Sequence, residues 1–191
     1  MDDLPLRESR RAVTLIELLV VLAVLAVLVG LALPRLDNAR FRADANVRQV
    51  RTALQQAQRL SRKQQHDVIV SFDITGGRIR VIEDNDNSRT HTAGEHVAWR
   101  GLTDGARFVV PVAGISGPVA AAVSGTNMAN MDGMPTVTFH GGGSATSNIE
   151  VYLQVDGKKK ANAVRGVTLE QSSGRTQWYS YIGALWKIGG N

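Results

Sequence analysis

Apolar positions dominate the beginning of the chain in one unbroken block. The stretch from Leu18 to Leu33 carries no charge, and it reaches back to Val13 uncharged except at Glu17. A helix of this length is about 30 Å long at about 1.5 Å per residue, close to the thickness of a bilayer's hydrocarbon core. The pattern therefore predicts a transmembrane helix in residues 13–34.

A different helical pattern follows Pro34. Proline removes one backbone donor and its ring clashes with the preceding turn, so we expect a kink at this residue. Beyond it, small and apolar residues recur at steps of three and four, which places them on one face of a helix. These residues are Leu36, Ala39, Ala43, Val47, Val50, Leu54, Ala57 and Ser61. Arginine and lysine fill the other sides, as on a solvated face, and residues 35–65 are predicted as an amphipathic spine helix.

The pattern changes after Gln65 to short β-rich runs separated by glycine and asparagine. The predicted strands are residues 67–74, 77–82, 97–99, 107–110, 136–140, 149–155, 164–170 and 176–182. Thr75-Gly76-Gly77 indicates a tight hairpin turn, because glycine adopts positive φ easily. Residues 114–134 are expected to form a long loop. The expected fold class is α+β, a long kinked N-terminal helix packed on antiparallel β-sheet, with residues 66–191 as the globular domain.

Composition narrows this picture only slightly. At 191 residues the chain can hold one special N-terminal segment and one globular domain with its own core. The net charge of +5 and the pI of 10.0 favour contact with acidic surfaces, phosphates or membrane headgroups without choosing among them. Cysteine is absent, which excludes a disulfide framework and a thiolate metal site.

Charges near the apolar block set its expected orientation. Arg7, Arg10 and Arg11 precede the block, so the positive-inside tendency keeps the N-terminus cytoplasmic and places the globular domain on the other side. A secretory signal with Gly30-Leu31-Ala32 as its cleavage site, or a plain membrane anchor, would be simpler interpretations. Glu17 argues against both, because burying its charge costs about 3 kcal/mol and an anchor gains nothing from it.

The apolar block begins over residues 12–20 with Ala-Val-Thr-Leu-Ile-Glu-Leu-Leu-Val. This order of residues resembles the processing site of type IV pilins and type II secretion pseudopilins. The resemblance implies that a prepilin peptidase cuts between Ala12 and Val13, removes residues 1–12 as a leader and N-methylates Val13. Glu17 then becomes the fifth mature residue, an assembly residue whose carboxylate pairs with the N-terminal ammonium of a neighbouring subunit. The family usually has glycine before the cut and phenylalanine or methionine after it, whereas this sequence has Ala12 and Val13 at those positions.

Three features of the remaining sequence resemble the GspH/FimT group of the pilin superfamily. They are the strand Val68–Phe72 after a spine helix, Val137-Thr138-Phe139 before a Gly-Ser turn, and Gly174-Arg175. The resemblance implies a minor pseudopilin of a type II secretion system, a structural subunit of a periplasmic pseudopilus in protein secretion. Its implied partners are a prepilin peptidase, the major and other minor pseudopilins, and an inner-membrane assembly platform. Its implied location is the inner membrane, single-pass, with a periplasmic C-terminal domain.

An alternative interpretation is a FimT-like minor type IV pilin that binds DNA for uptake. Lys158, Lys159 and Lys160, together with Arg165 and Arg175, are candidate phosphate contacts. Trp178 lies nearby in the sequence and could offer a stacking surface. The simpler interpretation of the three lysines is a solvated turn.

Several motifs suggest catalysis or metal binding at first sight, yet no catalytic residue, metal ligand or cofactor is expected. His140-Gly141-Gly142-Gly143 has the letters of a lipase oxyanion loop, but no Gly-x-Ser-x-Gly elbow accompanies it. The spacing from His91 to His96 fits no zinc-protease pattern. Glu83-Asp84-Asn85-Asp86-Asn87 is acidic enough for calcium, but it is interpreted as a turn that lacks the glycine and the distal glutamate of a calcium loop, and calcium binding stays the minor alternative there. The phosphate-binding Gly-x-x-x-x-Gly-Lys motif is absent, so this chain is not expected to power assembly itself.

Overall fold

The computed structural model divides the chain into two compact units, Met1–Asp37 and Asn38–Asn191. It describes residues 14–32, 38–110, 113–115, 121–122, 128–155 and 163–189. Pro34 and the predicted kink lie outside these residues. A single long kinked helix is therefore not confirmed, and the two helices are described separately.

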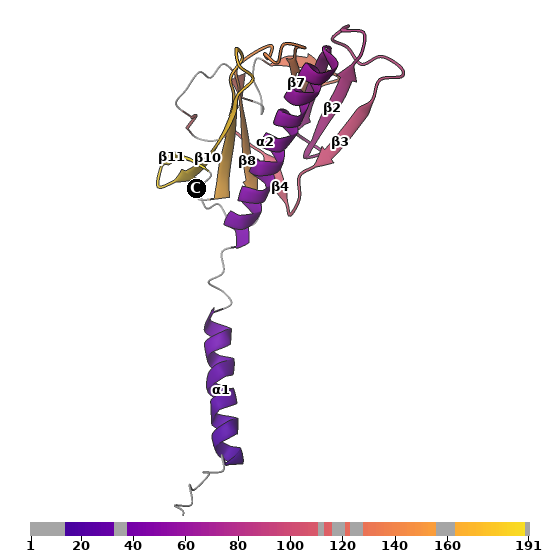
Figure 1. Cartoon of the computed structure of the whole chain (residues 1–191). Helices are drawn as coiled ribbons and strands as arrows, with labels where there is room; N and C mark the ends of the chain where they lie inside the picture. Colours follow the sequence, from indigo (N-terminus) through magenta and orange to yellow (C-terminus); the bar gives the residue numbers. More distant parts are fainter. Residues whose placement is uncertain are drawn as a thin grey trace, which may run out of the picture. The chain divides into compact units, whose positions relative to one another are not determined.

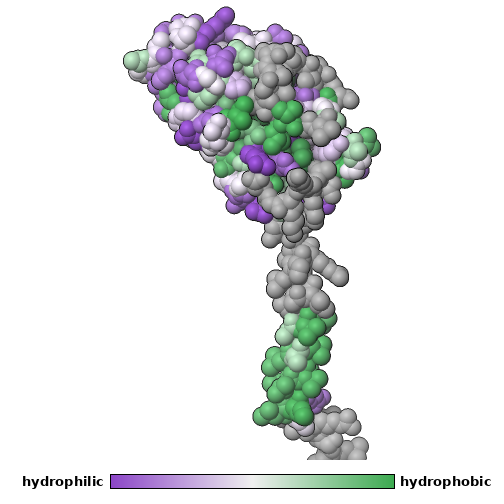
Figure 2. Space-filling model, turned by 180° about the vertical axis from the view of Figure 1, so that it is seen from behind, coloured by the Kyte–Doolittle hydropathy of each residue, from purple (hydrophilic) through white to green (hydrophobic). Residues whose placement is uncertain are grey.

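The first unit contains α1 (Leu15–Ala32), an 18-residue helix. Its described apolar side chains are exposed around the whole circumference, from 50% at Leu25 to 83% at Leu15, and Figure 2 shows α1 as an almost uniformly hydrophobic surface. No helix among the described residues is long and apolar enough to cross a membrane. The predicted transmembrane segment, residues 13–34, extends past α1 at both ends into residues that are not described, and it is not confirmed.

The second unit begins with α2 (Asn38–Gln64), which lies within the predicted spine helix. The predicted stripe is confirmed for six of its eight members, which are at most 1% exposed, whereas Ala39 is half-buried and Leu36 lies outside the described residues. The six buried members are Ala43, Val47, Val50, Leu54, Ala57 and Ser61. The helix ends at Gln64, and the following Gln65 has the left-handed conformation of a C-terminal cap (φ 58°) and donates its N–H to the Ser61 carbonyl.

Two sheets follow, where the sequence predicted antiparallel sheet without dividing it. The first has the order β3-β2-β1-β7-β6, and all of its pairs are antiparallel. Its strands are β1 (Asp67–Asp73), β2 (Arg78–Asp84), β3 (Val97–Gly101), β6 (Ala129–Met131) and β7 (Met134–Phe139). The predicted hairpin at residues 75–77 is confirmed, because Asp73 of β1 pairs with Arg78 of β2.

The second sheet has the order β11-β10-β9-β8-β4, with antiparallel pairs, and β5 pairs with β8 in parallel. Its strands are β4 (Ala106–Phe108), β5 (Ala121–Ala122), β8 (Ile149–Val155), β9 (Val164–Leu169), β10 (Thr176–Ile182) and β11 (Leu185–Ile188). Figure 1 shows α2 running along both sheets, with β2 and β3 to one side and β8 and β10 to the other.

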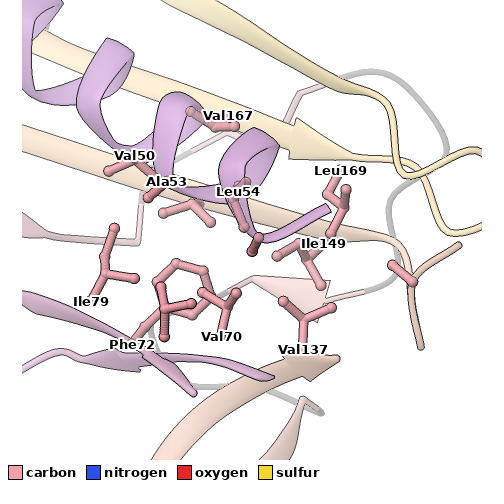
Figure 3. Packing of buried hydrophobic residues seen from close by; sticks show 14 of the residues in the cluster. Val50, Ala53, Leu54, Val70, Phe72, Ile79, Val137, Ile149, Val167 and Leu169 are labelled. Atoms are coloured by element: carbon pink, nitrogen blue, oxygen red, sulfur yellow. The ribbon is translucent and has the colours of Figure 1, made fainter. Parts of the chain in front are cut away.

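The core forms where α2 meets the two sheets. Helix α2 contacts β1, β2 and β7 of the first sheet and β4, β8, β9 and β10 of the second. Figure 3 shows Leu54 and Ala53 of α2 above Val70 and Phe72 of the first sheet, with Ile149, Val167 and Leu169 of the second sheet beside them. Phe72 and Phe108 also join the sheets directly, edge to face, with ring centroids 5.8 Å apart.

Strands β5, β6 and β11 correct the sequence interpretation. The first two lie in residues 114–134, which were expected to form a loop. Met131 pairs with Met134, so Asp132-Gly133 is a two-residue hairpin turn in which both residues have positive φ. Gly183-Ala184 makes the equivalent turn between β10 and β11. Short strands closed by such turns can form even in a segment rich in small residues.

Polar side chains of α2 fix the loops around it. Asn46 is fully buried; its Oδ1 accepts from the Thr103 N–H at 2.8 Å, and its Nδ2 donates to the Thr103 carbonyl at 3.1 Å. Nε2 of Gln58 donates to the carbonyls of Gly143 (2.9 Å) and Ser173 (2.7 Å). One helix therefore positions loops that belong to both sheets.

A buried acid lies on β8. Glu150 is 4% exposed; one of its carboxylate oxygens accepts from the Tyr152 hydroxyl, and the other has no partner among the described residues. The N–H of Ile115 donates to the same hydroxyl at 3.0 Å. Burial raises the pKa of Glu150, and the hydrogen bond from Tyr152 opposes that rise only in part. Burial, and then the hydrogen bond to Glu150, also raises the pKa of Tyr152.

The raised pKa of Glu150 makes stability depend on pH. The folded protein binds a proton at Glu150 more tightly than the unfolded chain does. The protonated carboxyl therefore adds to the free energy of unfolding below the usual pKa of 4.5, and this stabilisation is lost as pH rises through the raised value. We expect Glu150→Gln to remove this loss and to be more stable than the wild type at pH 7. Urea unfolding in detergent, at pH values from below 4.5 up to 7, measures the free energy of unfolding of both proteins. Asp104→Asn, at an exposed turn position, is the control, and an unchanged pH dependence in Glu150→Gln would contradict the assignment.

Candidate functional site

The first turn of α1 carries the candidate assembly residue. Oγ1 of Thr14 accepts a hydrogen bond from the Glu17 N–H at 3.3 Å, and the Thr14 carbonyl accepts from the Leu18 N–H at 3.2 Å. Thr14 is thus the N-cap, and Glu17 occupies the third helical position, as in a capping-box sequence. A carboxylate at this end also interacts favourably with the helix dipole. The exposed Glu17 side chain is therefore compatible with helix formation before any partner binds.

Several predicted site residues lie outside the described part of the chain. These are the cleavage-site residues Ala12 and Val13, the kink residue Pro34, and the basic residues Lys158, Lys159 and Lys160. Their roles stay predictions.

Arg175 is exposed at the turn between β9 and β10. The preceding Gly174 has a φ of +65°, and a Cβ there would lie 2.1 Å from Nε2 of Gln58 and 2.3 Å from the Gly143 carbonyl oxygen. Packing therefore explains why glycine occupies the first position of the predicted Gly-Arg pair, since no side chain fits between this turn and α2. Only the arginine remains available for binding.

The structure corrects two further candidates for DNA contact. Arg165 is 2% exposed, and its Nε donates to Oδ1 of Asp44 at 2.5 Å. Trp178 is 4% exposed and belongs to the core, with the Arg48 guanidinium carbon 5.6 Å from its ring centroid. Both side chains pack against α2, through Asp44 and Arg48, so neither offers a surface to a nucleic acid.

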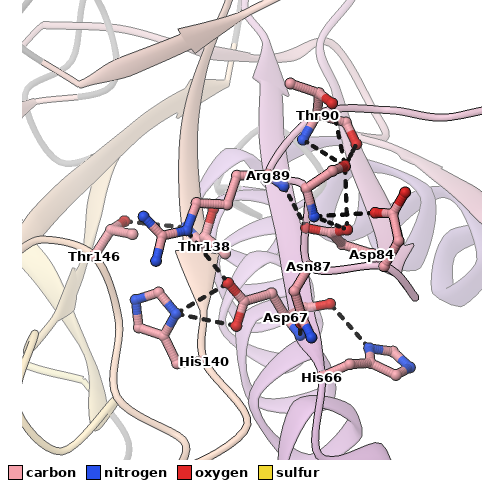
Figure 4. A network of polar contacts seen from close by, with 11 residues as sticks. His66, Asp67, Asp84, Asn87, Arg89, Thr90, Thr138, His140 and Thr146 are labelled. Carbon is pink, nitrogen blue, oxygen red and sulfur yellow. Dashed lines mark hydrogen bonds and ion pairs between the residues drawn. The ribbon is translucent and has the colours of Figure 1, made fainter.

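The histidine beside the glycine run has a carboxylate partner. Nδ1 of His140 lies 3.0 Å from Oδ1 of Asp67, and Nε of Arg89 lies 3.7 Å from the other oxygen of the same carboxylate (Figure 4). Residues 140–143 form the expected turn, closed by the Gly143 N–H donating to the His140 carbonyl at 2.6 Å. A polar cavity of about 540 Å³ borders His140, but among the described contacts no nucleophilic side chain bonds to its other ring nitrogen. This arrangement fastens β1 to β7.

Three carboxylates meet in the connection between β2 and β3. One oxygen from each of Asp84, Asp86 and Glu95 lies within 4.8 Å of the others. Asp84 ends β2 fully buried; its oxygens accept from the N–H groups of Ser88 (2.9 Å) and Arg89 (2.7 Å). Figure 4 shows these bonds folding the loop back over Asp84. The arrangement could hold a cation.

The surroundings of Asp84 and Asp86 shift the pKa values of these two carboxyls in opposite directions. Burial raises the pKa of Asp84, and the neighbouring groups of Asp86 and Glu95 raise it further, against the opposing N–H bonds from Arg89 and Ser88. Hydrogen bonds from Ser88 hold the pKa of Asp86 below its usual value. The loop thus contains a buried acid that is costly to ionise beside one that ionises readily.

The interpretation that residues 83–87 lack a distal glutamate was wrong. Glu95 lies eleven residues after Asp84, and its Oε2 accepts from the Thr92 N–H at 2.8 Å. The loop returns at Glu95 because β3 begins two residues later and pairs with β2. Counting forward from Asp84 would have found it, since a glutamate eleven residues on is a spacing that calcium loops share.

A comparison with known families identifies the N-terminal segment. Residues 7–33 match the family model described as the prokaryotic N-terminal methylation motif. No curated protein and no solved structure matches the chain. The motif implies processing by a prepilin peptidase and assembly with other pilins into a pilus or pseudopilus, and it suggests membrane anchoring. It indicates that this chain is a type IV pilin-like or pseudopilin protein.

Proposed function

We propose that this protein is a minor pseudopilin of a type II secretion system, a structural subunit without a catalytic site. The observation that carries the proposal is the methylation motif at residues 7–33, which includes Glu17 and the whole of α1. A prepilin peptidase would cut between Ala12 and Val13 and methylate Val13. The subunit would then join the major and other minor pseudopilins through an inner-membrane assembly platform.

The surface of α1 supports a role in assembly. A helix that is apolar on all sides is buried in its working environment, and α1 exposes apolar side chains all around. In the proposed pseudopilus it packs among the equivalent helices of other subunits, after anchoring the chain in the inner membrane with the C-terminal domain in the periplasm. Glu17 would bind the N-terminal ammonium of a neighbour, which fixes the axial register.

Processing is the first prediction of this proposal. The full chain, co-expressed with a prepilin peptidase, should lose residues 1–12 and begin with N-methylated Val13. N-terminal sequencing and intact-mass measurement of membrane fractions check this result, with a catalytically inactive peptidase as control. Retention of Met1 in assembled material would exclude processing at this site.

A second prediction concerns Glu17. Glu17→Gln should be cleaved normally, but its incorporation into filaments should fall by at least about tenfold, because an ammonium buried among apolar helices would lose its counter-charge. Glu17→Asp keeps the charge and should retain more incorporation than Glu17→Gln. Cross-linking to the major pseudopilin measures incorporation, and equal incorporation of the Gln variant and the wild type would refute the pairing.

The alternative, a minor pilin that binds DNA, has one observation in its favour, the exposed Arg175. The secretion proposal predicts no submicromolar binding of duplex DNA at low salt by the full chain in nonionic detergent. Fluorescence anisotropy at two salt concentrations tests this, because phosphate contacts weaken steeply with salt. Salt-sensitive binding that disappears when Lys158, Lys159, Lys160 and Arg175 are all replaced by alanine would favour DNA uptake instead.

A further inference from the structure

The connection between β2 and β3 concentrates negative charge, and no ion pair reaches its three clustered carboxylates from the part of the chain that the structure describes. Asp84, Asp86 and Glu95 bring ligand oxygens within 4.8 Å of one another. The nearest cationic candidate in the loop, Arg89, directs its guanidinium to Asp67, at 3.7 Å, and only its backbone N–H serves Asp84. Like charges this close are unfavourable unless a cation or a proton neutralises them.

Burial makes this imbalance more severe. Asp84 has no exposed surface, and no ion pair is recorded for it among the described residues. Oε1 of Glu95 is also buried and has no hydrogen-bond partner there, although Oε2 of the same carboxylate is bonded to Thr92. A buried oxygen left without a donor carries a desolvation cost that a directly bound cation would remove. This free oxygen belongs to the residue that closes the cluster.

The sequence spacing identifies the kind of cation. A twelve-residue calcium loop supplies ligands from positions one, three, five, seven, nine and twelve, with a bidentate glutamate at the last. Starting at Asp84, these positions are occupied by Asp84, Asp86, Ser88, Thr90, Thr92 and Glu95. Position six, which is usually glycine, is Arg89, but its φ of 62° is the left-handed conformation that glycine provides there.

We propose that residues 84–95 bind one Ca²⁺ ion, with Asp84, Asp86 and Glu95 as carboxylate ligands. Calcium–oxygen distances are about 2.4 Å, so oxygens bound to one ion lie at most about 4.8 Å apart, as these three do. The Thr90 carbonyl already accepts from Ser88 Oγ at 3.0 Å, which keeps positions five and seven together. The ion would join the end of β2 to the residue that precedes β3 by two positions, and so fix the connection between them.

Calcium titration of the full chain tests this inference independently of processing or secretion. Protein stripped with EDTA in nonionic detergent should bind one Ca²⁺ per chain with a dissociation constant between about 10 μM and 1 mM by calorimetry. Mg²⁺ should bind at least about tenfold more weakly, because it requires shorter, octahedral coordination. Glu95→Gln should weaken calcium binding by at least about tenfold through loss of the bidentate ligand.

Matched variants separate a specific site from general attraction to acidic protein. Glu83→Gln removes the same charge from the adjacent residue, whose carboxylate is bonded to Gln64 and His96, and should bind calcium within about twofold of the wild type. Asp86→Ala changes an exposed ligand, so it tests the site even if Glu95→Gln fails to fold. Absence of saturable binding up to millimolar calcium, or equal affinity in Asp86→Ala, Glu83→Gln and the wild type, would overturn the proposal.

Discussion

The C-terminal domain depends on one helix that packs against two sheets at once. The buried face of α2 contacts strands of both sheets, and its apolar residues between Val47 and Ala57 lie in the same core cluster as Val70 and Val167. A β-sheet must bury its apolar face against another element, and here α2 and the other sheet together cover the apolar face of each sheet. The alanines at positions 53 and 57 allow this close approach, while Leu54 fills the space between the layers.

The same constraint explains the turns near the end of α2. Gln58 bonds to the carbonyls of Gly143, in the connection between β7 and β8, and of Ser173, in the turn between β9 and β10. Gly143 and Gly174 both have positive φ, and an added Cβ at either would lie closer than 3 Å to α2 side chains. These glycines serve packing, so a motif that contains them is weak support for a binding function. A binding role for Arg175, which follows Gly174, therefore depends on the exposed arginine side chain alone.

The sequence predicted those features in which local pattern and tertiary structure agree. The spine helix, its buried stripe, the hairpin after β1 and the long strands β8, β9 and β10 follow from periodicity and glycine placement. Periodicity could not show that the strands form two sheets, because pairing depends on contacts distant in sequence. It also failed for β6 and β11, where the turns Asp132-Gly133 and Gly183-Ala184 were stronger signals than the short strands beside them. Arg165 and Trp178 were misplaced because charge and aromaticity do not reveal burial.

Two buried charges in the domain are handled differently. Nε of Arg165 lies 2.5 Å from Oδ1 of Asp44, whereas fully buried Asp84 accepts from the N–H groups of Ser88 and Arg89 and from the Ser88 hydroxyl, with two further carboxylates nearby. Asp44 neutralises the first, and uncharged donors stabilise the second without neutralising it. The loop that creates this imbalance leads directly into β3, which forms one edge of its sheet and carries the half-exposed Trp99 under Arg78. A cation held at Asp84 would therefore stabilise the charge and restrain the position of an exposed sheet edge at the same time.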